Sequence, residues 1–260
     1  MVMQESGSGK NHAGTERFGI VGMPPLAELE RLNRRGCEIV DLDEPQVRAD
    51  IDRTSRYLPR VYCAVLRTVV LNAMHLELDG VLIDVGPGKC DCARHVAEVL
   101  DAMLPCPVVR TENRDSRPFG IPLCRTKMAL PEKLRRITAS VRTVTPHGEL
   151  PACRPTAGFW GVPPRDFSIL DLFPETTHIY GWTRCMENKT PADFELEMRI
   201  NPEVPTVFFA QSFCAKTALA RHLAEHHPLG LYLDCDVTAG NSARSKVEAF
   251  LELSGVARPR

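Results

Sequence analysis

The chain has 260 residues, a formal net charge of −1 and 43% hydrophobic residues, which are values of an ordinary globular protein. The near-zero charge argues against wholesale binding to nucleic acid or acidic lipid. No stretch approaches the roughly 18 apolar residues of a membrane span, and the polar N-terminus carries no signal-peptide core. The sequence therefore predicts a cytoplasmic protein whose partners include neither nucleic acid nor a membrane.

Short apolar runs alternate with helical periodicity in the first part of the chain. Strands are predicted at 18–21, 38–42, 81–85 and 107–110, and helices at 24–35, 45–58, 60–75 and 93–104. All-apolar strands separated by helices are typical of a parallel sheet covered on both faces. The predicted divisions are a disordered tail (1–16), a first α/β half (17–112), a linker region (113–155) with a helix at 131–142, and a second α/β half (156–260).

The second half repeats the first. A Gly-x-x-Gly-x-Pro-Pro phrase occurs at 19–25 and again at 158–164, and Ala-Arg-His-Val-Ala-Glu at 93–98 returns as Ala-Arg-His-Leu-Ala-Glu at 220–225. The strands predicted for the second half follow in the same order, at 178–182, 206–210 and 230–233. We therefore predict an internal duplication. It gives two similar Rossmann-like halves with parallel sheets and a cleft between them, the second half lacking a counterpart of the helix at 60–75.

Cysteines follow several of the predicted strands. Parallel sheets bind ligands outside the carboxyl ends of their strands, and Cys90 and Cys214 follow the third strand of each half. With Cys185, and Cys92 or Cys153 as a fourth, they are predicted to hold a metal centre. An iron–sulfur cluster is favoured and zinc or no metal is the alternative, because thiolates ligate both. The remaining cysteines are predicted to be buried core thiols: Cys37, Cys63, Cys106, Cys124 and Cys235.

This arrangement resembles, in architecture alone, iron–sulfur enzymes of the quinolinate synthase kind. In those enzymes duplicated or triplicated α/β domains each give a cysteine to one central cluster. No motif of such a family matches this chain residue by residue, so the resemblance assigns no role to any residue.

Glycines and cations at the same strand ends predict a small anionic ligand, such as a carboxylate or a phosphate. Gly86 and Gly88 lie between a strand and a helix, where backbone N–H groups bind anions, and Lys89, Arg184 and Lys216 add positive charge. Neither the P-loop nor the dinucleotide-binding fingerprint is complete. The sequence thus favours a metal-centre protein, such as an iron–sulfur reductase or lyase, acting on a small anion in the cleft.

Two alternatives remain open. Cys214 follows an apolar strand and precedes a helix, so the helix N-terminus and Lys216 are expected to lower its pKa and make it a metal-free nucleophile. His147 or His178 would be the base. The second alternative is a non-catalytic carrier of a metal or cofactor, which would use the same cysteines as ligands.

Two further features are predicted to be structural. The acidic residues Asp193, Glu195 and Glu197 are expected to form an exposed helix face. Trp182 is expected to pack in the core rather than to line a ligand site.

Overall fold

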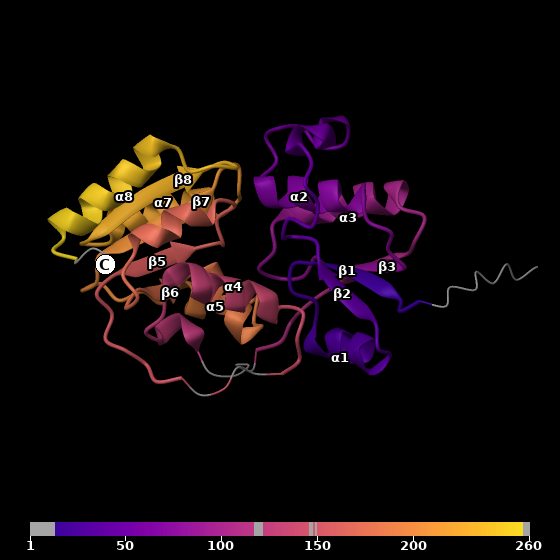
Figure 1. The fold of residues 1–260 in the computed structure, drawn as a ribbon, viewed down its shortest axis with the longest axis horizontal. Helices are drawn as coiled ribbons and strands as arrows, with labels where there is room; N and C mark the ends of the chain where they lie inside the picture. The colour runs from indigo at the N-terminus through magenta and orange to yellow at the C-terminus, as the bar shows by residue number, and fades with distance from the viewer. Residues whose placement is uncertain (1–13, 117–121, 146–147, 149, 257–260) are drawn as a thin grey trace, which may run out of the picture.

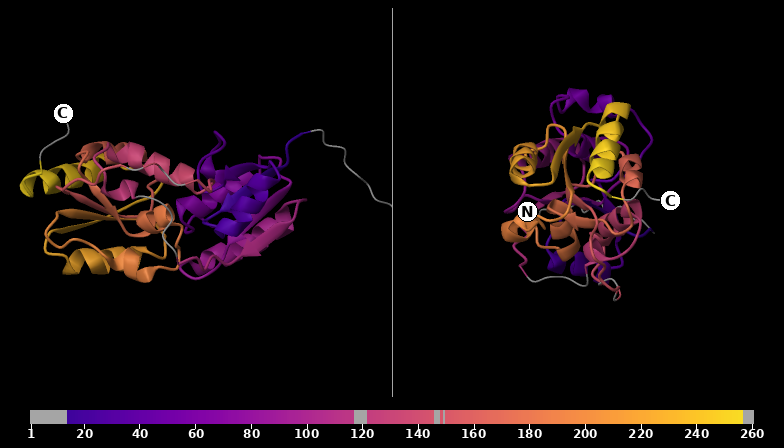
Figure 2. Two further views of the ribbon diagram at one scale, coloured as in Figure 1. Left: turned by 90° about the horizontal axis from the view of Figure 1, so that it is seen from below. Right: turned by 90° about the vertical axis from the view of Figure 1, so that its left-hand side faces the viewer.

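The computed structural model of the chain describes residues 14–116, 122–145, 148 and 150–256. Residues 1–13, which make up most of the predicted N-terminal tail, lie outside this range. Within it the chain forms two four-stranded parallel sheets, each flanked by helices. They lie side by side along the long axis of the molecule (Figures 1 and 2). Among the described residues, no helix is long and apolar enough to cross a membrane.

The first half contains a sheet in the order β2-β1-β3-β4. Its strands are β1 (Arg17–Val21), β2 (Glu38–Asp41), β3 (Gly80–Asp84) and β4 (Val108–Thr111), and its helices are α1 (Leu26–Arg34), α2 (Ala64–Ala73) and α3 (Asp91–Met103). Successive strand residues point to opposite faces. Ile20 accordingly packs with Leu29 of α1, whereas Val21 packs with Leu66 of α2 and Val96 of α3. Helices therefore cover both faces of this sheet (Figure 1).

The second half repeats the order as β6-β5-β7-β8. Its strands are β5 (Gly158–Gly161), β6 (His178–Tyr180), β7 (Thr206–Gln211) and β8 (Gly230–Cys235). Every pairing between strands is parallel in both sheets. Strands that correspond in the repeat hold corresponding places in the two sheets. The predicted pair of similar α/β halves is confirmed.

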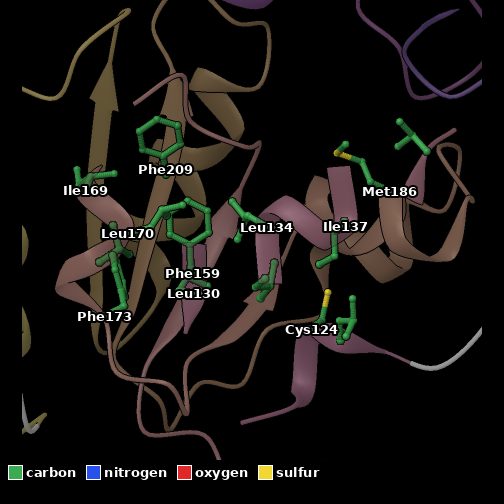
Figure 3. Packing of buried hydrophobic residues seen from close by; sticks show 14 of the residues in the cluster. Cys124, Leu130, Leu134, Ile137, Phe159, Ile169, Leu170, Phe173, Met186 and Phe209 are labelled. Carbon is green, nitrogen blue, oxygen red and sulfur yellow. The ribbon is translucent and has the colours of Figure 1, made fainter. Parts of the chain in front are cut away.

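The core of the second half lies on both faces of its sheet. The helices are α4 (Leu130–Ser140), α7 (Thr217–His226) and α8 (Asn241–Leu253), with 3₁₀ helices η2 (Leu123–Arg125) and η3 (Phe167–Leu172). Trp160 packs under α7, while its neighbour Phe159 stacks on Phe209 in the cluster that holds Leu134 of α4 (Figure 3). The helix of the predicted linker region thus contributes its buried face to the second half.

The predicted helix at 45–58 is wrong. Only a 3₁₀ helix, η1 (Ile51–Arg56), forms there. The backbone N–H of Gln46 donates to the Asn72 side chain, and the Gln46 amide donates to the Asp41 carbonyl. These hydrogen bonds attach the segment to β2 and α2, and Asp50 then caps η1. Side-chain bonds from polar residues compete with helical backbone bonds in this way.

The second half does not simply lack the helix at 60–75. Two short helices, α5 (Trp182–Asn188) and α6 (Phe194–Met198), occupy the connection from β6 to β7. Their place in the chain corresponds to that of η1 and α2 in the first half.

The two halves approach each other closely at the carboxyl ends of their sheets. Gly88, in the loop after β3, has a φ of +81° and lies so near the second half that an added Cβ would be 1.9 Å from the Pro191 carbonyl oxygen. Asn113, after β4, donates to the Met23 carbonyl at 3.0 Å and reaches the Lys189 carbonyl at 3.5 Å. Loops that follow the strands of one half therefore pack on the α5–α6 segment of the other.

Candidate functional site

A cavity of about 280 Å³ lies where the carboxyl ends of the two sheets face each other. Both halves contribute to its wall. Its ionisable and amide side chains are Asp41, Asp43, Glu44, Asp84, Lys89, Arg165, Gln211 and Lys216, and its thiols are Cys63, Cys90 and Cys214. This is the position at which parallel α/β sheets bind ligands.

A larger hollow of about 890 Å³ lies at the amino ends of the strands of the first half. Its charged side chains lie at the surface, and some are paired, as Arg17 Nε is with Glu38 Oε2 at 2.8 Å. Exposed pairs of this kind are already solvated. The smaller cavity holds the buried ionisable groups and is the candidate site.

Asp84 and Lys89 form a buried ion pair in the cavity wall. Asp84 ends β3, and its Oδ1 accepts the backbone N–H groups of Gly86 at 3.1 Å and Asn113 at 3.0 Å. Its Oδ2 faces Lys89 Nζ at 3.2 Å. Burial lowers the pKa of Lys89, while the Asp84 charge opposes that effect. The two backbone hydrogen bonds fix the carboxylate, so the loop after β3 presents Lys89 in one orientation.

Two lysines contact the ring of Trp182. Lys89 Nζ is 4.3 Å and Lys216 Nζ 4.9 Å from its ring centre, which is within cation–π range. Lys216 also donates to both carboxylate oxygens of Glu197 at 2.6 and 2.8 Å. The predicted exposed position of Glu197 is wrong, since this residue is 3% exposed. Trp182 is half-buried: it packs against the hydrophobic core, as predicted, and it also lines the cavity.

Three carboxyl groups at the end of β2 and just after it lie on the cavity wall. Asp41 Oδ1 accepts the backbone N–H of Asp43, and Asp43 Oδ2 accepts that of Gly22 at 2.8 Å. Burial raises the pKa of Asp41 well above its usual value, and the charges of Asp43 and Glu44 add to the effect. Burial also raises the pKa of Asp43 and of Glu44. These pKa shifts favour the protonated acid form, which can donate a hydrogen bond or a proton.

Arg165 brings a cation from the second half to these carboxyl groups. Its backbone N–H donates to Gln211 Oε1 at 3.2 Å, and the Gln211 amide is itself bound to the carbonyls of Cys235 and Asp236. Burial lowers the pKa of Arg165, while Glu44 and Asp43 raise it. The end of β7 therefore anchors Arg165 beside the acidic group of the first half.

Several polar atoms of the cavity wall have no hydrogen-bond partner. Among the described residues, six buried side-chain nitrogen or oxygen atoms have no hydrogen-bond partner, and three of them belong to Asp84, Lys89 and Arg165. The atoms are Asp84 Oδ2, Lys89 Nζ and Arg165 Nε. An unsatisfied buried polar group costs about 1–3 kcal/mol. Asp84 Oδ2 and Lys89 Nζ face each other as an ion pair at 3.2 Å, so the full cost falls on Arg165 Nε, and a polar ligand in the cavity would satisfy it.

Three thiols from separate segments line the same cavity. Cys63 is the N-cap of α2, Cys90 the N-cap of α3, and Cys214 precedes α7. Burial raises the pKa of Cys63 to about 12, and the proximity of Cys214 and Cys90 adds to this. Burial likewise raises the pKa of Cys214 and outweighs the lowering by Lys216. The lowered pKa expected for a Cys214 nucleophile is therefore wrong.

The other predicted cysteine ligands lie elsewhere. Cys92 faces Cys90 from the first turn of α3 but does not line the cavity, and Cys185 is buried in α5, where its thiol lies 3.6 Å from the Asp193 carbonyl. Cys153 lies at the opposite end of the second sheet, 3.8 Å from His178, the first residue of β6. Of the predicted ligand set, the structure brings only Cys90 and Cys214 to the cavity.

Only some of the predicted anion-binding residues line the cavity. Gly88, Lys89 and Lys216 line the cavity. Gly86 does not, since it packs against the backbone of the loop after β4. Arg184 lies on α5. Its charge opposes the rise that burial causes in the pKa of Cys124 and adds to the fall that burial causes in the pKa of His178. Of the proposed bases for Cys214, His178 is at the far end of the sheet and His147 lies outside the described residues.

The sequence interpretation missed three components of the site. Cys63 was assigned to the core, and the acidic group of Asp41, Asp43 and Glu44 and the cation of Arg165 were not singled out. A signal for the acids was present, because Asp41 lies near the end of a predicted strand and Asp43 and Glu44 directly follow it. Among the described residues, no three His, Cys, Asp or Glu side chains form a group that could hold a metal ion.

No family model, curated protein or solved structure matches the chain.

Proposed function

We propose that the cavity between the two halves is an active site for a small molecule that carries a carboxylate or a phosphate. The observation that carries the proposal is the buried Arg165 Nε, which has no hydrogen-bond partner among the described residues. Arg165 lines the same cavity as the buried ion pair of Asp84 and Lys89. A ligand anion that accepts a hydrogen bond from Arg165 Nε would remove the cost of leaving this atom unsatisfied.

Arg165 is the proposed anchor for the anionic group. A guanidinium stays charged when buried and offers a planar fork of donors that matches a carboxylate or phosphate. Its Nε is unpartnered, and its backbone is fixed through Gln211. The anion would compete with Asp43 and Glu44 for this cation, and their raised pKa values make protonated, uncharged forms accessible.

Proton transfer is the proposed chemistry. Asp41 is 4% exposed, and its raised pKa favours a carboxylic acid at a pH where an exposed aspartate is ionised. A buried acid at a cavity wall is suited to donate a proton to a substrate and to recover it later. The thiols and the apolar side chains of Leu66 and Leu219 form another part of the wall and would contact the uncharged part of the molecule.

Arg165→Gln should weaken binding of the ligand roughly 10- to 100-fold, because a hydrogen bond to a charged group contributes about 1.5–3 kcal/mol. A thermal-shift screen of small carboxylates and phosphates would identify a ligand, and calorimetric titration would measure its affinity. Arg142→Gln is the matched control, since Arg142 is exposed, its charge acts on Asp41 and Glu44, and it does not line the cavity. Equal affinity in Arg165→Gln and the unchanged protein would contradict the proposal, as would a screen without any ligand.

A thiolate metal centre is the second candidate, because Cys63, Cys90 and Cys214 line one cavity and their proximity raises the pKa of Cys63. Metal binding would displace the thiol protons, and it would need the three side chains to move closer together. An iron–sulfur cluster or zinc is the expected group.

Protein purified without oxygen should then contain iron with sulfide, or zinc, and Cys63→Ala and Cys214→Ala should each lose it. Elemental and sulfide analysis would measure the metal content. Cys37→Ala, which alters a buried thiol beside α1, should keep the metal. Colourless protein without iron, zinc or sulfide would eliminate the metal centre and leave the proposal based on Arg165 untouched.

A further inference from the structure

We propose that Lys89 is a nucleophile that forms an imine with a ketone or aldehyde group of the bound anion. The inference rests on the proposed function and specifies its substrate class: a small molecule with one carbonyl group and one carboxylate or phosphate.

Lys89 is placed as a nucleophile requires. Its side chain is 8% exposed and lines the cavity, and its Nζ is paired with the Asp84 carboxylate at 3.2 Å. The Nζ also lies 4.3 Å from the ring centre of Trp182. Burial lowers the pKa of Lys89 and the charge of Lys216 adds to this, while the charges of Asp84 and Asp43 oppose it. A desolvated lysine next to a second cation is the environment that makes an amine nucleophilic near neutral pH.

The other buried lysines are used differently. Lys133 donates to the Thr177 carbonyl at 2.5 Å, and Lys189 donates to the Ser140 carbonyl at 2.6 Å. Burial lowers the pKa of each to about 8, but neither lines the cavity. Lys216 does line it, yet both oxygens of Glu197 bind its Nζ. Lys89 thus combines burial with access to the cavity, and its partner is a carboxylate that can accept its proton.

Asp84 is positioned to handle the protons of the reaction. Its Oδ2 takes one proton from the ammonium of Lys89, and the neutral Nζ attacks the carbonyl carbon to form a C–N bond. Asp84 returns this proton to the oxygen of the carbinolamine and then relays a second proton from the nitrogen to the same oxygen, which leaves as water when the C–O bond breaks. Of the three ammonium protons, two leave in that water and one stays on the iminium nitrogen. Because two backbone N–H groups hold Oδ1, Oδ2 remains directed at Lys89 during these steps.

The presence of Lys89 and Arg165 in one cavity wall supports a substrate that carries both a carbonyl group and an anionic group. Lys89 and Arg165 line the same cavity, and their charges both oppose the rise that burial causes in the pKa of Asp43. An anionic group on Arg165 would bring a carbonyl on the same small molecule to Lys89. A cavity of about 280 Å³ has room for a molecule of a few carbon atoms.

Trapping with sodium borohydride tests the inference. The full-length protein is incubated with glyoxylate or with glycolaldehyde phosphate, the smallest aldehydes that carry each anionic group, and then reduced. We expect one stable adduct per chain by intact mass, assigned to Lys89 by peptide mapping. Lys89→Arg should lose this adduct, and Lys127→Arg, a change at an exposed lysine, should keep it.

Adducts on exposed lysines without one at Lys89, equal labelling in Lys89→Arg, or no adduct at all would overturn the inference. The proposed function has a separate readout, since anion binding and its loss in Arg165→Gln are measured without borohydride. Binding that depends on Arg165 without trapping at Lys89 would defeat only the imine. If neither occurs, both proposals fail.

Discussion

Replacing Gly88 by alanine should lower the free energy of unfolding by about 2–5 kcal/mol. Two costs add. Positive φ costs an L-residue roughly 1–2 kcal/mol, and Gly88 has a φ of +81°. Forcing an atom into a packed interface costs about 1–3 kcal/mol more, and here the new Cβ would overlap the Pro191 carbonyl. Because the obstacle is backbone of the other half, a side-chain rotation cannot relieve it.

Two other glycines separate these costs. Gly36 also has positive φ, +71°, but nothing lies within 4 Å of an added Cβ. Gly36→Ala should therefore show the backbone cost alone, about 1–2 kcal/mol. Gly240 has negative φ and open space, and its replacement should have little effect. Urea unfolding of the three variants measures the differences. If Gly88→Ala costs no more than Gly36→Ala, the two halves do not pack at this point.

Breaking the ion pair of Lys216 with Glu197 should have an effect of similar size. The side chain of Glu197 is 4% exposed and that of Lys216 is 20% exposed. Removing one partner of a buried pair typically costs about 3–5 kcal/mol, because the remaining charge is buried alone. Lys216→Met should therefore cost about 3 kcal/mol or more. Glu197→Leu should cost less, since Lys216 retains some access to water.

The double variant distinguishes an ion pair from two independent contributions. Replacing both residues by apolar ones removes both charges, and such replacements are often nearly neutral. We expect Glu197→Leu/Lys216→Met to be more stable than Lys216→Met alone, with a coupling energy of about 2 kcal/mol in a double-mutant cycle. Additive effects of the two substitutions would contradict the pairing. Chemical denaturation of all four proteins provides the measurement.

The sequence by itself determined the architecture. All-apolar runs such as 81–85 alternate with helical periodicity, and this alternation dictates strands buried on both faces between covering helices. The repeated phrase at 19–25 and 158–164 correctly indicated two similar halves. Because ligands bind beyond the carboxyl ends of parallel strands, the position of Cys90, Lys89 and Cys214 after a predicted strand also placed them at the cavity.

Only the tertiary structure decided which other side chains join them. Cys63 reaches the cavity because α2 begins there, whereas Cys153, equally plausible in sequence, lies at the far end of a strand. Glu197 sits in an acidic segment that reads as exposed, yet packing of α6 against the start of α7 buries it on Lys216. The pattern of apolar residues in a segment indicates which face of a helix or strand is apolar. It does not indicate which segment of the other half will cover that face, so contacts between the halves cannot be predicted from either half alone.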